Sequence, residues 1–549
     1  MEGVAALSEL RTRETPRATW RHDRRFLAGV SLLYLGLSLV VLFSVDRFWS
    51  ANWDVEIFLG AARSFYDGGS LFDLYEKSRQ QFYWPYPYPP LYAMVLAPFV
   101  WLADLSFMPA WAPLVAVRLP VFIADVGLAW TLYAIVWHAT ARRPLARLAA
   151  VAWLFTPILF YQTAIQAHQE SVWLWPAVLA YWHVVRKDVE QTWLPATLLS
   201  VAIALKQSAV LYAIPFGLYL LWRRRWKDVG VFGFLFLLIF GGLALPFHLY
   251  SDDFFYMVFV DVPNMPVQTQ SWIVWLLAFK GYLIEQTRST FPLIRYASAI
   301  TLATTALVSA LWLFRRREVL REAPPHRVTF AWFAPGVLVT LAFFLTSQKV
   351  MAYHYPMLVP WLLAALLSVG RVRLVTATLL WVSWIVVSPY YAPWANPERL
   401  PLYASLGTLN SLFFLGLLIA LFRIRLEALP GQDGQEDAVA SAVGWLFLLM
   451  AGFVLSALAH PLTTLVEERG PARQALIFGL LALVFGLMVS SYAALRRTVG
   501  RLTGVDLPPL RAAHVMAALW FAPLFFTWFA MTREITYIIE KGLWKAWKL

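Results

Sequence analysis

The chain has 549 residues, of which 60% are hydrophobic and only 14% are charged, and it contains no cysteine. A soluble domain has roughly 45–50% apolar residues, so the composition excludes an ordinary soluble protein. The absence of cysteine excludes disulfides, thiolate metal sites and cysteine nucleophiles. The formal net charge is +13, but the arginines gather in short loops between apolar runs, as in cytoplasmic loops, and not along one nucleic-acid-binding face. We therefore expect an all-α polytopic protein of the cell membrane, with membrane lipids and no nucleic acid among its partners.

The basic loops set the predicted orientation of the chain. Residues 1–25 form a polar arm rich in arginine, which we expect in the cytoplasm, and residues 26–45 form the first span. Residues 46–90 are then the first extracytoplasmic loop. Further basic clusters, also predicted to be cytoplasmic, lie at 142–147, 223–227, 315–321 and 496–501.

The first extracytoplasmic loop opens with two carboxylates, Asp54 and Glu56, directly after a membrane span. An ionised carboxylate at the bilayer edge is costly unless water, a partner or a substrate offsets it, so this loop is the first candidate for chemistry. Residues 55–66 carry their apolar side chains on one stripe, which predicts a helix on the membrane surface. Tyr86 and Tyr88 lie in the tract YPYPPLY, whose prolines predict an extended, aromatic-walled return to the membrane.

The remaining apolar runs predict most of the other elements. Residues 91–137 must cross once, with 93–109 re-entrant, or three times, because their flanks lie on opposite sides. Residues 272–284 are expected on the outer surface, and residues 426–437 form a polar cytoplasmic linker before the C-terminal membrane helices of 438–549, which end in an amphipathic helix. The other spans are expected at 148–165, 171–185, 229–249, 293–314, 330–345, 356–367, 375–387, 402–422, 438–459, 475–495 and 512–531, with two short crossings inside 193–222.

Counting crossings brings a second set of polar residues to the same outer face as Asp54. A cavity with a carboxylate, basic groups and aromatic walls suits transfer from a phosphate-linked donor, because the carboxylate deprotonates an acceptor hydroxyl while lysines stabilise the leaving phosphate. Lys206 and Lys349 are the predicted donor-phosphate ligands. The set consists of His168, Gln169, Glu170, Lys206, Gln268, Gln348, Lys349, Tyr353 and His354.

Several short motifs resemble one family of membrane enzymes. Asp54-x-x-x-Phe58, the pairs Ala61-Ala62 and Gly68-Gly69, and the tracts LFDLY and YPYPPLY are similar to the first outer loop of GT-C glycosyltransferases, and most of all to bacterial polyprenol-phosphate-mannose-dependent mannosyltransferases. The segments ALKQSAVLYAIP, QTQSW and TSQKVMAYHYPMLVPW resemble later elements of that family. Residues 166–170 stand where the family carries a Gly-Gln-x-Asp or Asn element; here the glycine is absent and Glu170 replaces the acid. The resemblance covers residues 26–425.

The resemblance implies a GT-C-like bundle of about 12–16 transmembrane helices with extracytoplasmic loop helices. It also implies an inverting transfer of a sugar, here mannose, from a polyprenyl-phosphate donor to a lipid, glycan or protein acceptor of the cell envelope. Asp54 matches the catalytic carboxylate, and His354 and Glu170 are further catalytic candidates. No cofactor is expected, and a metal-free form is favoured over one using a divalent metal. Candidate substrate-binding residues are Glu56, Tyr86, Tyr88, His168, Gln169, Gln268, Gln348 and Tyr353.

Two other functions fit parts of the sequence. A transporter or flippase of lipid-linked sugars would also hold charged groups in a membrane cavity, but it predicts polar residues near mid-membrane in both halves of a repeat. A non-catalytic scaffold with a GT-C-like fold is the second alternative.

Overall fold

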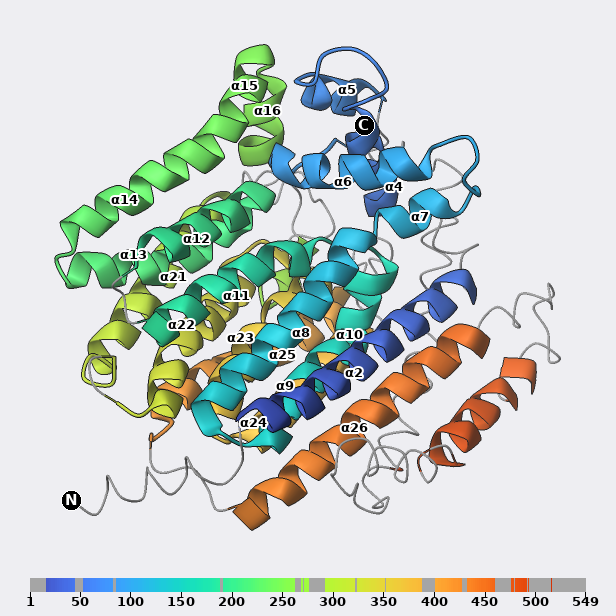
Figure 1. The fold of residues 1–549 in the computed structure, drawn as a ribbon, viewed down its shortest axis with the longest axis vertical. Helices are drawn as coiled ribbons and strands as arrows, with labels where there is room; N and C mark the ends of the chain where they lie inside the picture. The colour runs from blue at the N-terminus through green and yellow to red at the C-terminus, as the bar shows by residue number, and fades with distance from the viewer. Residues whose placement is uncertain are drawn as a thin grey trace.

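The computed structural model of this protein describes the greater part of the chain, and its helices are shown in Figure 1. Long helices run side by side through the body of the molecule, and shorter ones cover one end of it. The described residues are 16–44, 53–81, 85–187, 191–261, 268–269, 271–275, 292–320, 323–350, 352–387, 400–426, 432–459, 475–477, 479–490, 492 and 515.

The elements of the described residues follow in chain order. The first are α2 (Pro16–Ser44), α4 (Trp53–Arg63), α5 (Leu74–Gln81), α6 (Pro90–Ala103), α7 (Ala112–Ala116), α8 (Leu119–Thr140), α9 (Arg143–Leu154), α10 (Pro157–Leu159), the π-helical turn η1 (Phe160–Ile165), α11 (Glu170–Lys187), α12 (Trp193–Leu205), the 3₁₀ turn η3 (Gln207–Ala209) and α13 (Val210–Trp222). They are followed by α14 (Trp226–Phe236), η4 (Leu237–Gly241), α15 (Gly242–Tyr250), α16 (Asp253–Phe255), η5 (Tyr256–Asp261), β1 (Gln268–Thr269), α20 (Pro292–Arg295), α21 (Ala297–Arg315), α22 (Pro325–Thr346), β2 (Lys349–Val350), η6 (Ala352–Met357), α23 (Val359–Ser368), α24 (Val372–Val387), α25 (Leu400–Arg423) and α26 (Gln432–Ala459).

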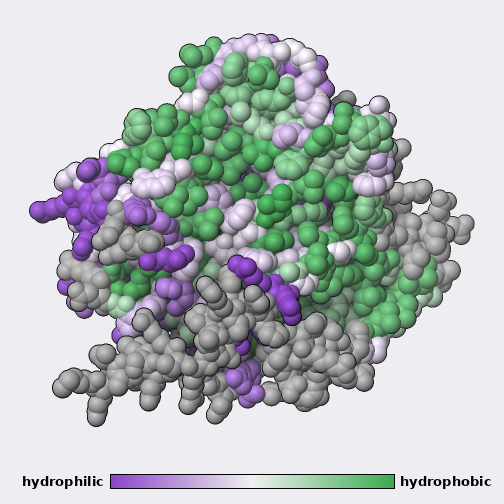
Figure 2. All heavy atoms as spheres, in the orientation of Figure 1, coloured by the Kyte–Doolittle hydropathy of each residue, from purple (hydrophilic) through white to green (hydrophobic). Residues whose placement is uncertain are grey.

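The predicted all-α polytopic class is confirmed, while the predicted number of 12–16 membrane helices stays a prediction. Within the described residues, eight helices are long and apolar enough to cross a membrane. One of these segments, Trp226–Tyr250, leaves almost all of its apolar side chains at the protein surface. Figure 2 shows that apolar atoms cover most of the middle of one face, while hydrophilic atoms lie at its left edge, over the turn between α13 and α14. Such a surface is stable in lipid and not in water, because burying it in hydrocarbon removes it from water.

Three details of the expected chain path can be compared with the structure. The region 91–137 contains the short helices α6 and α7 and one long helix, α8, as in the single-crossing alternative; α6 packs against α4 and lies across the end of the bundle (Figure 1). The run 193–222 is broken at Lys206, whose backbone is extended between α12 and η3, as predicted. Within the predicted linker 426–437, α26 begins at Gln432.

Some expectations concern residues that the structure does not describe. These are the first fifteen residues of the amino-terminal arm, most of the predicted surface segment 272–284, and the C-terminal run 512–549 apart from residue 515. The rest of the arm, from Pro16, is part of the long helix α2. The helix of the first span therefore begins within the predicted arm.

The core below the candidate site is built from aromatic side chains. Trp361 of α23 stacks on Tyr212 of α13 with ring centroids 5.0 Å apart, and Tyr212 contacts Trp173 of α11 at 5.4 Å. Trp361 fits because Gly336 of α22 lies against it; a Cβ at Gly336 would come within 2.2 Å of the indole ring. The Tyr212 hydroxyl hydrogen-bonds Thr340 Oγ1 at 2.6 Å. This packing fixes α11, α13, α22 and α23 to one another.

Polar contacts hold the loop helices at the end of the bundle. Arg63 of α4 makes two hydrogen bonds of 2.7 Å to Asp104, and the Tyr66 hydroxyl donates to the same carboxylate. The Arg63 guanidinium holds the pKa of Asp104 below its ordinary value. Arg79 of α5 pairs with Asp253 at 2.6 Å, which joins the segment between α2 and α6 to the segment after α15. Bidentate and clustered charges of this kind restrict orientation, even where each pair contributes little energy.

Candidate active site

Asp54 and His168, which lie far apart in the sequence, meet at one end of the bundle. Asp54 is in the first turn of α4, where the helix dipole favours a negative charge. Its Oδ2 atom lies 3.2 Å from Nε2 of His168, within hydrogen-bonding distance. The His168 side chain is 4% exposed and that of Asp54 is 30% exposed, so only the carboxylate remains accessible to a substrate.

The backbone before His168 is unusual and positions the imidazole. η1 forms a π-helical turn, and the fully buried Ala167 then adopts a left-handed φ of 59°. A non-glycine residue in this region is strained, and such strain gathers at functional sites. The His168 N–H donates to the Gln162 carbonyl at 2.9 Å, and Tyr353 stacks on the imidazole with centroids 4.5 Å apart. The backbone hydrogen bond to Gln162 and the stacked ring of Tyr353 therefore fix the orientation of the His168 imidazole.

A buried ion pair lies beside this dyad. Lys206 Nζ donates to Glu170 Oε1, and Trp173 Nε1 donates to Glu170 Oε2 at 2.7 Å. Glu170 is fully buried and Lys206 is 5% exposed. The ammonium also lies over two aromatic rings, 5.4 Å from the centroid of Tyr88 and 5.7 Å from that of Tyr353. The break in the helix at Lys206 thus directs the lysine to Glu170 between two aromatic walls.

Burial controls the charge of the neighbouring groups. It lowers the pKa of His168, although Asp54 and Glu170 oppose the shift, while Lys206 and Lys349 add to it. The imidazole is therefore neutral at neutral pH, since even the ordinary pKa of histidine is about 6.5. Burial also raises the pKa of Tyr88 well above its ordinary value, with Tyr353 and Asp54 adding to the shift, so its phenol stays protonated.

Two short strands bring in the last predicted group. β1 and β2 pair in parallel, with Gln268 opposite Lys349 and Thr269 opposite Val350. Gln348, directly before Lys349, is buried, and Lys349 is half-buried. His354 is buried against Tyr353, with ring centroids 4.3 Å apart. The TSQKVMAYHY segment therefore contributes the lysine, the aromatic wall and a second histidine from one stretch of chain.

Other predicted residues lie at the edges of this group. Glu56 has an exposed side chain, although partial burial raises its pKa. Tyr86 is fully buried behind Tyr88, and its hydroxyl donates to the Pro89 carbonyl at 3.2 Å, so it supports the aromatic wall. Both polar side-chain atoms of Gln169 are buried without a hydrogen-bond partner among the described residues, as expected of an amide that meets a substrate.

One contributor escaped the sequence analysis. Trp173 was treated as part of an apolar span, yet it is a hydrogen-bond donor to Glu170. Trp173 follows Glu170 by three residues, which places both side chains on one face of a helix. This spacing could have predicted the contact from the sequence.

Residues 86–343 match the model of glycosyltransferase family 87. The match to family 87 spans just under half of the chain and includes Tyr88, His168, Glu170 and Lys206, but not Asp54 or Lys349. It confirms the resemblance to membrane glycosyltransferases of the GT-C type.

No curated protein shows significant sequence similarity to the chain. Among solved structures, that of ArnT from Cupriavidus metallidurans bound to undecaprenyl phosphate is similar over 92% of this chain and 88% of its own, at 13% identity and a TM-score of 0.41. This likeness is distant, and the resemblance to glycosyltransferases is carried by the match to family 87.

Proposed function

We propose that this protein is an integral-membrane glycosyltransferase that transfers a sugar, mannose, from a polyprenyl-phosphate donor to a lipid, glycan or protein acceptor on the extracytoplasmic face. The observation that carries the proposal is the accessible carboxylate of Asp54. It contacts His168, whose ring stacks on Tyr353, and Lys206 lies over the same tyrosine ring. The family match supports the reaction class. Mannose and the donor class come from the motifs around Asp54 and Lys349, and a metal-free reaction stays a prediction.

In the proposed reaction, Asp54 removes the proton of an acceptor hydroxyl as that oxygen attacks the anomeric carbon of the sugar. The bond between this carbon and the phosphate oxygen breaks in the same step, and polyprenyl phosphate leaves with the bonding electrons. Attack opposite the leaving group inverts the anomeric carbon. Neutral His168 orients the Asp54 carboxylate, and Lys349 stabilises the charge that develops on the phosphate.

The reaction is tested by incubating the purified protein in lipid with radiolabelled polyprenyl-phosphate mannose and membrane extract. We expect label to move into an extractable lipid, glycan or protein product. Polyprenyl-phosphate glucose serves as the comparison donor. No transfer from either donor would contradict the proposed activity, whereas transfer from glucose alone would contradict only the choice of sugar.

Lys349 is the better position at which to test donor-phosphate binding, because replacing Lys206 would also leave the buried Glu170 without its partner. Replacing Lys349 by Met is expected to weaken binding of a polyprenyl-phosphate donor analogue at least tenfold, since a hydrogen bond to a charged group contributes about 1.5–3 kcal/mol. Lys77→Met is the matched control, because it removes a partly buried lysine charge from α5, at the same end of the bundle, that is not a predicted phosphate ligand. Equal affinities of the Lys349→Met and Lys77→Met proteins would place the phosphate elsewhere.

Sidedness can be tested directly, because the chain has no cysteine of its own. Ser78 is an unsuitable labelling position, since it is fully buried and its Oγ accepts from the Tyr86 N–H. Exposed Gln80→Cys and Asp252→Cys are expected to react with an impermeant thiol reagent on intact cells, and Lys227→Cys and Arg317→Cys only after permeabilisation. The opposite pattern would place the candidate site in the cytoplasm and exclude the proposed orientation.

A further inference from the structure

A second polar cavity lies at the far end of α23 from the candidate active site. Its volume is about 840 Å³, it opens to the surface, and it is lined by the turn before α24, the end of α25 and the start of α26. Four exposed arginines line it: Arg371, Arg373, Arg423 and Arg425. Among the described residues, none of the four is ion-paired and no carboxylate lines the cavity. A cavity with this lining concentrates positive charge and attracts an anion.

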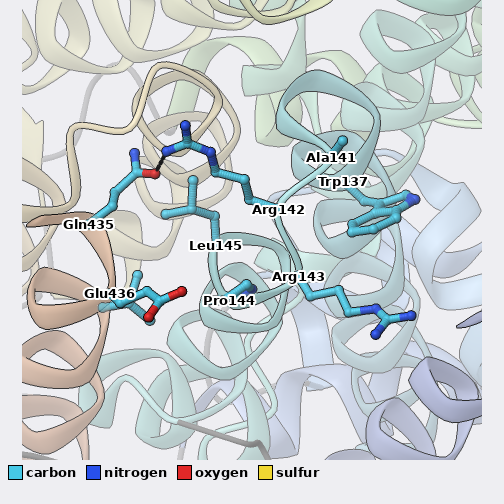
Figure 3. A pocket seen from close by; sticks show the side chains of 9 residues that line it. Trp137, Ala141, Arg142, Arg143, Pro144, Leu145, Gln435 and Glu436 are labelled. Atoms are coloured by element: carbon cyan, nitrogen blue, oxygen red, sulfur yellow. Dashed lines mark hydrogen bonds between the residues drawn. The ribbon is translucent and has the colours of Figure 1, made fainter. Parts of the chain in front are cut away.

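A buried amide adds a hydrogen-bond donor to the arginines. Gln435 of α26 lines the cavity and is only 5% exposed. Its Oε1 accepts a hydrogen bond from Arg142, which fixes the amide so that its nitrogen is directed away from that arginine (Figure 3). Nε2 has no hydrogen-bond partner in the described part of the chain. A buried donor without a partner is costly, and an oxyanion in the cavity would satisfy it.

The local backbone supplies further donors. Gly370 has a left-handed φ of 69°, which lets α23 end and α24 begin two residues later. Val372, Arg373 and Leu374 form the first turn of α24 and line the cavity, and the first N–H groups of a helix have no partner within the helix. These groups and the helix dipole also favour an anion.

The end of α25 is held in place by two other arginines. Arg315 donates to the Phe422 carbonyl at 3.1 Å, and Arg316 donates to the Ile424 carbonyl at 2.6 Å. These bonds fix the backbone on either side of Arg423. The cavity is therefore formed by packed helix ends, which hold arginines from two distant parts of the sequence close together.

The surface next to the cavity is apolar. Leu412, Leu415 and Ile419 of α25 are 59%, 44% and 42% exposed, lie at helical spacing on one face, and lead to the arginines at the end of the helix. An acyl chain would be stable along this stripe while its headgroup lay in the cavity. A basic cavity between membrane helices with an apolar approach is the pattern expected of anionic lipid recognition.

We propose that this cavity binds the phosphate group of an anionic phospholipid. The general preference of cytoplasmic loops for arginine explains why these residues are basic, but not why four of them surround a cavity with an orphan amide donor and a helix N-terminus. The chemistry that the cavity recognises is a phosphate oxyanion. The apolar stripe on α25 favours a lipid as its source over a soluble phosphate.

The test uses native mass spectrometry of the full-length protein in detergent, titrated with phosphatidylglycerol or phosphatidylcholine. Arg371→Gln/Arg423→Gln is expected to weaken phosphatidylglycerol binding at least tenfold, because two charge-assisted contacts are lost. Arg423→Gln/Arg425→Gln, which removes both charges at the end of α25 and leaves the α24 side of the cavity unchanged, should weaken binding similarly. The matched control is Arg223→Gln/Lys227→Gln, which removes two exposed positive charges from the turn between α13 and α14 and should change affinity less than about twofold.

Equal losses in all three double variants would overturn the proposal, since binding would then follow net charge alone. Equal binding of phosphatidylcholine and phosphatidylglycerol by the wild-type protein would also overturn it. In a competition arm, glycerol 3-phosphate is expected to leave phosphatidylglycerol bound. Displacement of the lipid by millimolar glycerol 3-phosphate would overturn the lipid as the ligand and assign the cavity to a soluble phosphate.

Discussion

Replacing Asp54 by Asn is expected to lower sugar transfer by about 10²–10⁴-fold, the range that a general base contributes. The amide keeps the size of the carboxylate and its contact with His168, but it cannot accept a proton from the acceptor hydroxyl. Stability should change little, because the Asp54 side chain is 30% exposed. The measurement is the initial rate of label transfer from the donor, together with the melting temperature of the purified variant.

Asp67→Asn is the matched control for this prediction. Asp67 is an exposed carboxylate that follows α4 and is not among the predicted site residues. Its loss should change the rate less than about threefold, since it lies outside the group formed by Asp54, His168 and Tyr353. A rate for Asp54→Asn within about threefold of the wild-type rate would remove Asp54 from the mechanism. Equal losses in both variants would point to the charge of the loop and not to a general base.

Replacing Lys206 by Met is expected to lower the free energy of unfolding by about 3–5 kcal/mol, because it leaves the fully buried Glu170 carboxylate without its counter-charge. The double variant Lys206→Met/Glu170→Gln should recover most of this loss. In that protein the amide side chain at position 170 is neutral, and its oxygen can still accept from Trp173. Thermal unfolding of each purified protein in the same detergent measures the three stabilities.

Lys227→Met controls for the loss of a positive charge, because Lys227 is exposed in the turn between α13 and α14. Its melting temperature should match that of the wild-type protein. If the double variant were as unstable as Lys206→Met alone, the stabilising effect of Lys206 would come from its aromatic contacts with Tyr88 and Tyr353 and not from the ion pair.

The ion pair between Lys206 and Glu170 also affects how a loss of activity on replacing Lys206 should be interpreted. Lys206 was predicted from the sequence as a donor-phosphate ligand and Glu170 as a catalytic residue. In the structure each is the other's partner, so a loss of activity on changing either one includes a structural effect. Comparing the double variant with the Lys206→Met protein separates that effect from a loss of phosphate binding.

The sequence by itself determined the class of the protein and much of its chain path. Continuous apolar runs fix the membrane helices, since a polar backbone must be satisfied inside the bilayer whatever the tertiary contacts are. The break at Lys206 and the helix after Asp54 were predictable for similar local reasons: a lysine interrupts an apolar run, and apolar residues recur at helical spacing. The polar residues of the outer loops could be gathered into one candidate group by counting crossings.

Only the tertiary structure decided which of these residues touch. Side-chain pairing depends on distances of a few ångströms between segments that can lie more than a hundred residues apart, and these distances are set by helix packing, which periodicity does not encode. The structure thus joins the side chains of Asp54 and His168, and that of Glu170 to those of Lys206 and Trp173, while backbone strand pairing sets Gln268 opposite Lys349. The tertiary structure also brings four arginines from two distant segments to the lining of one cavity. The cavity forms because the end of α23, the end of α25 and the start of α26 meet there.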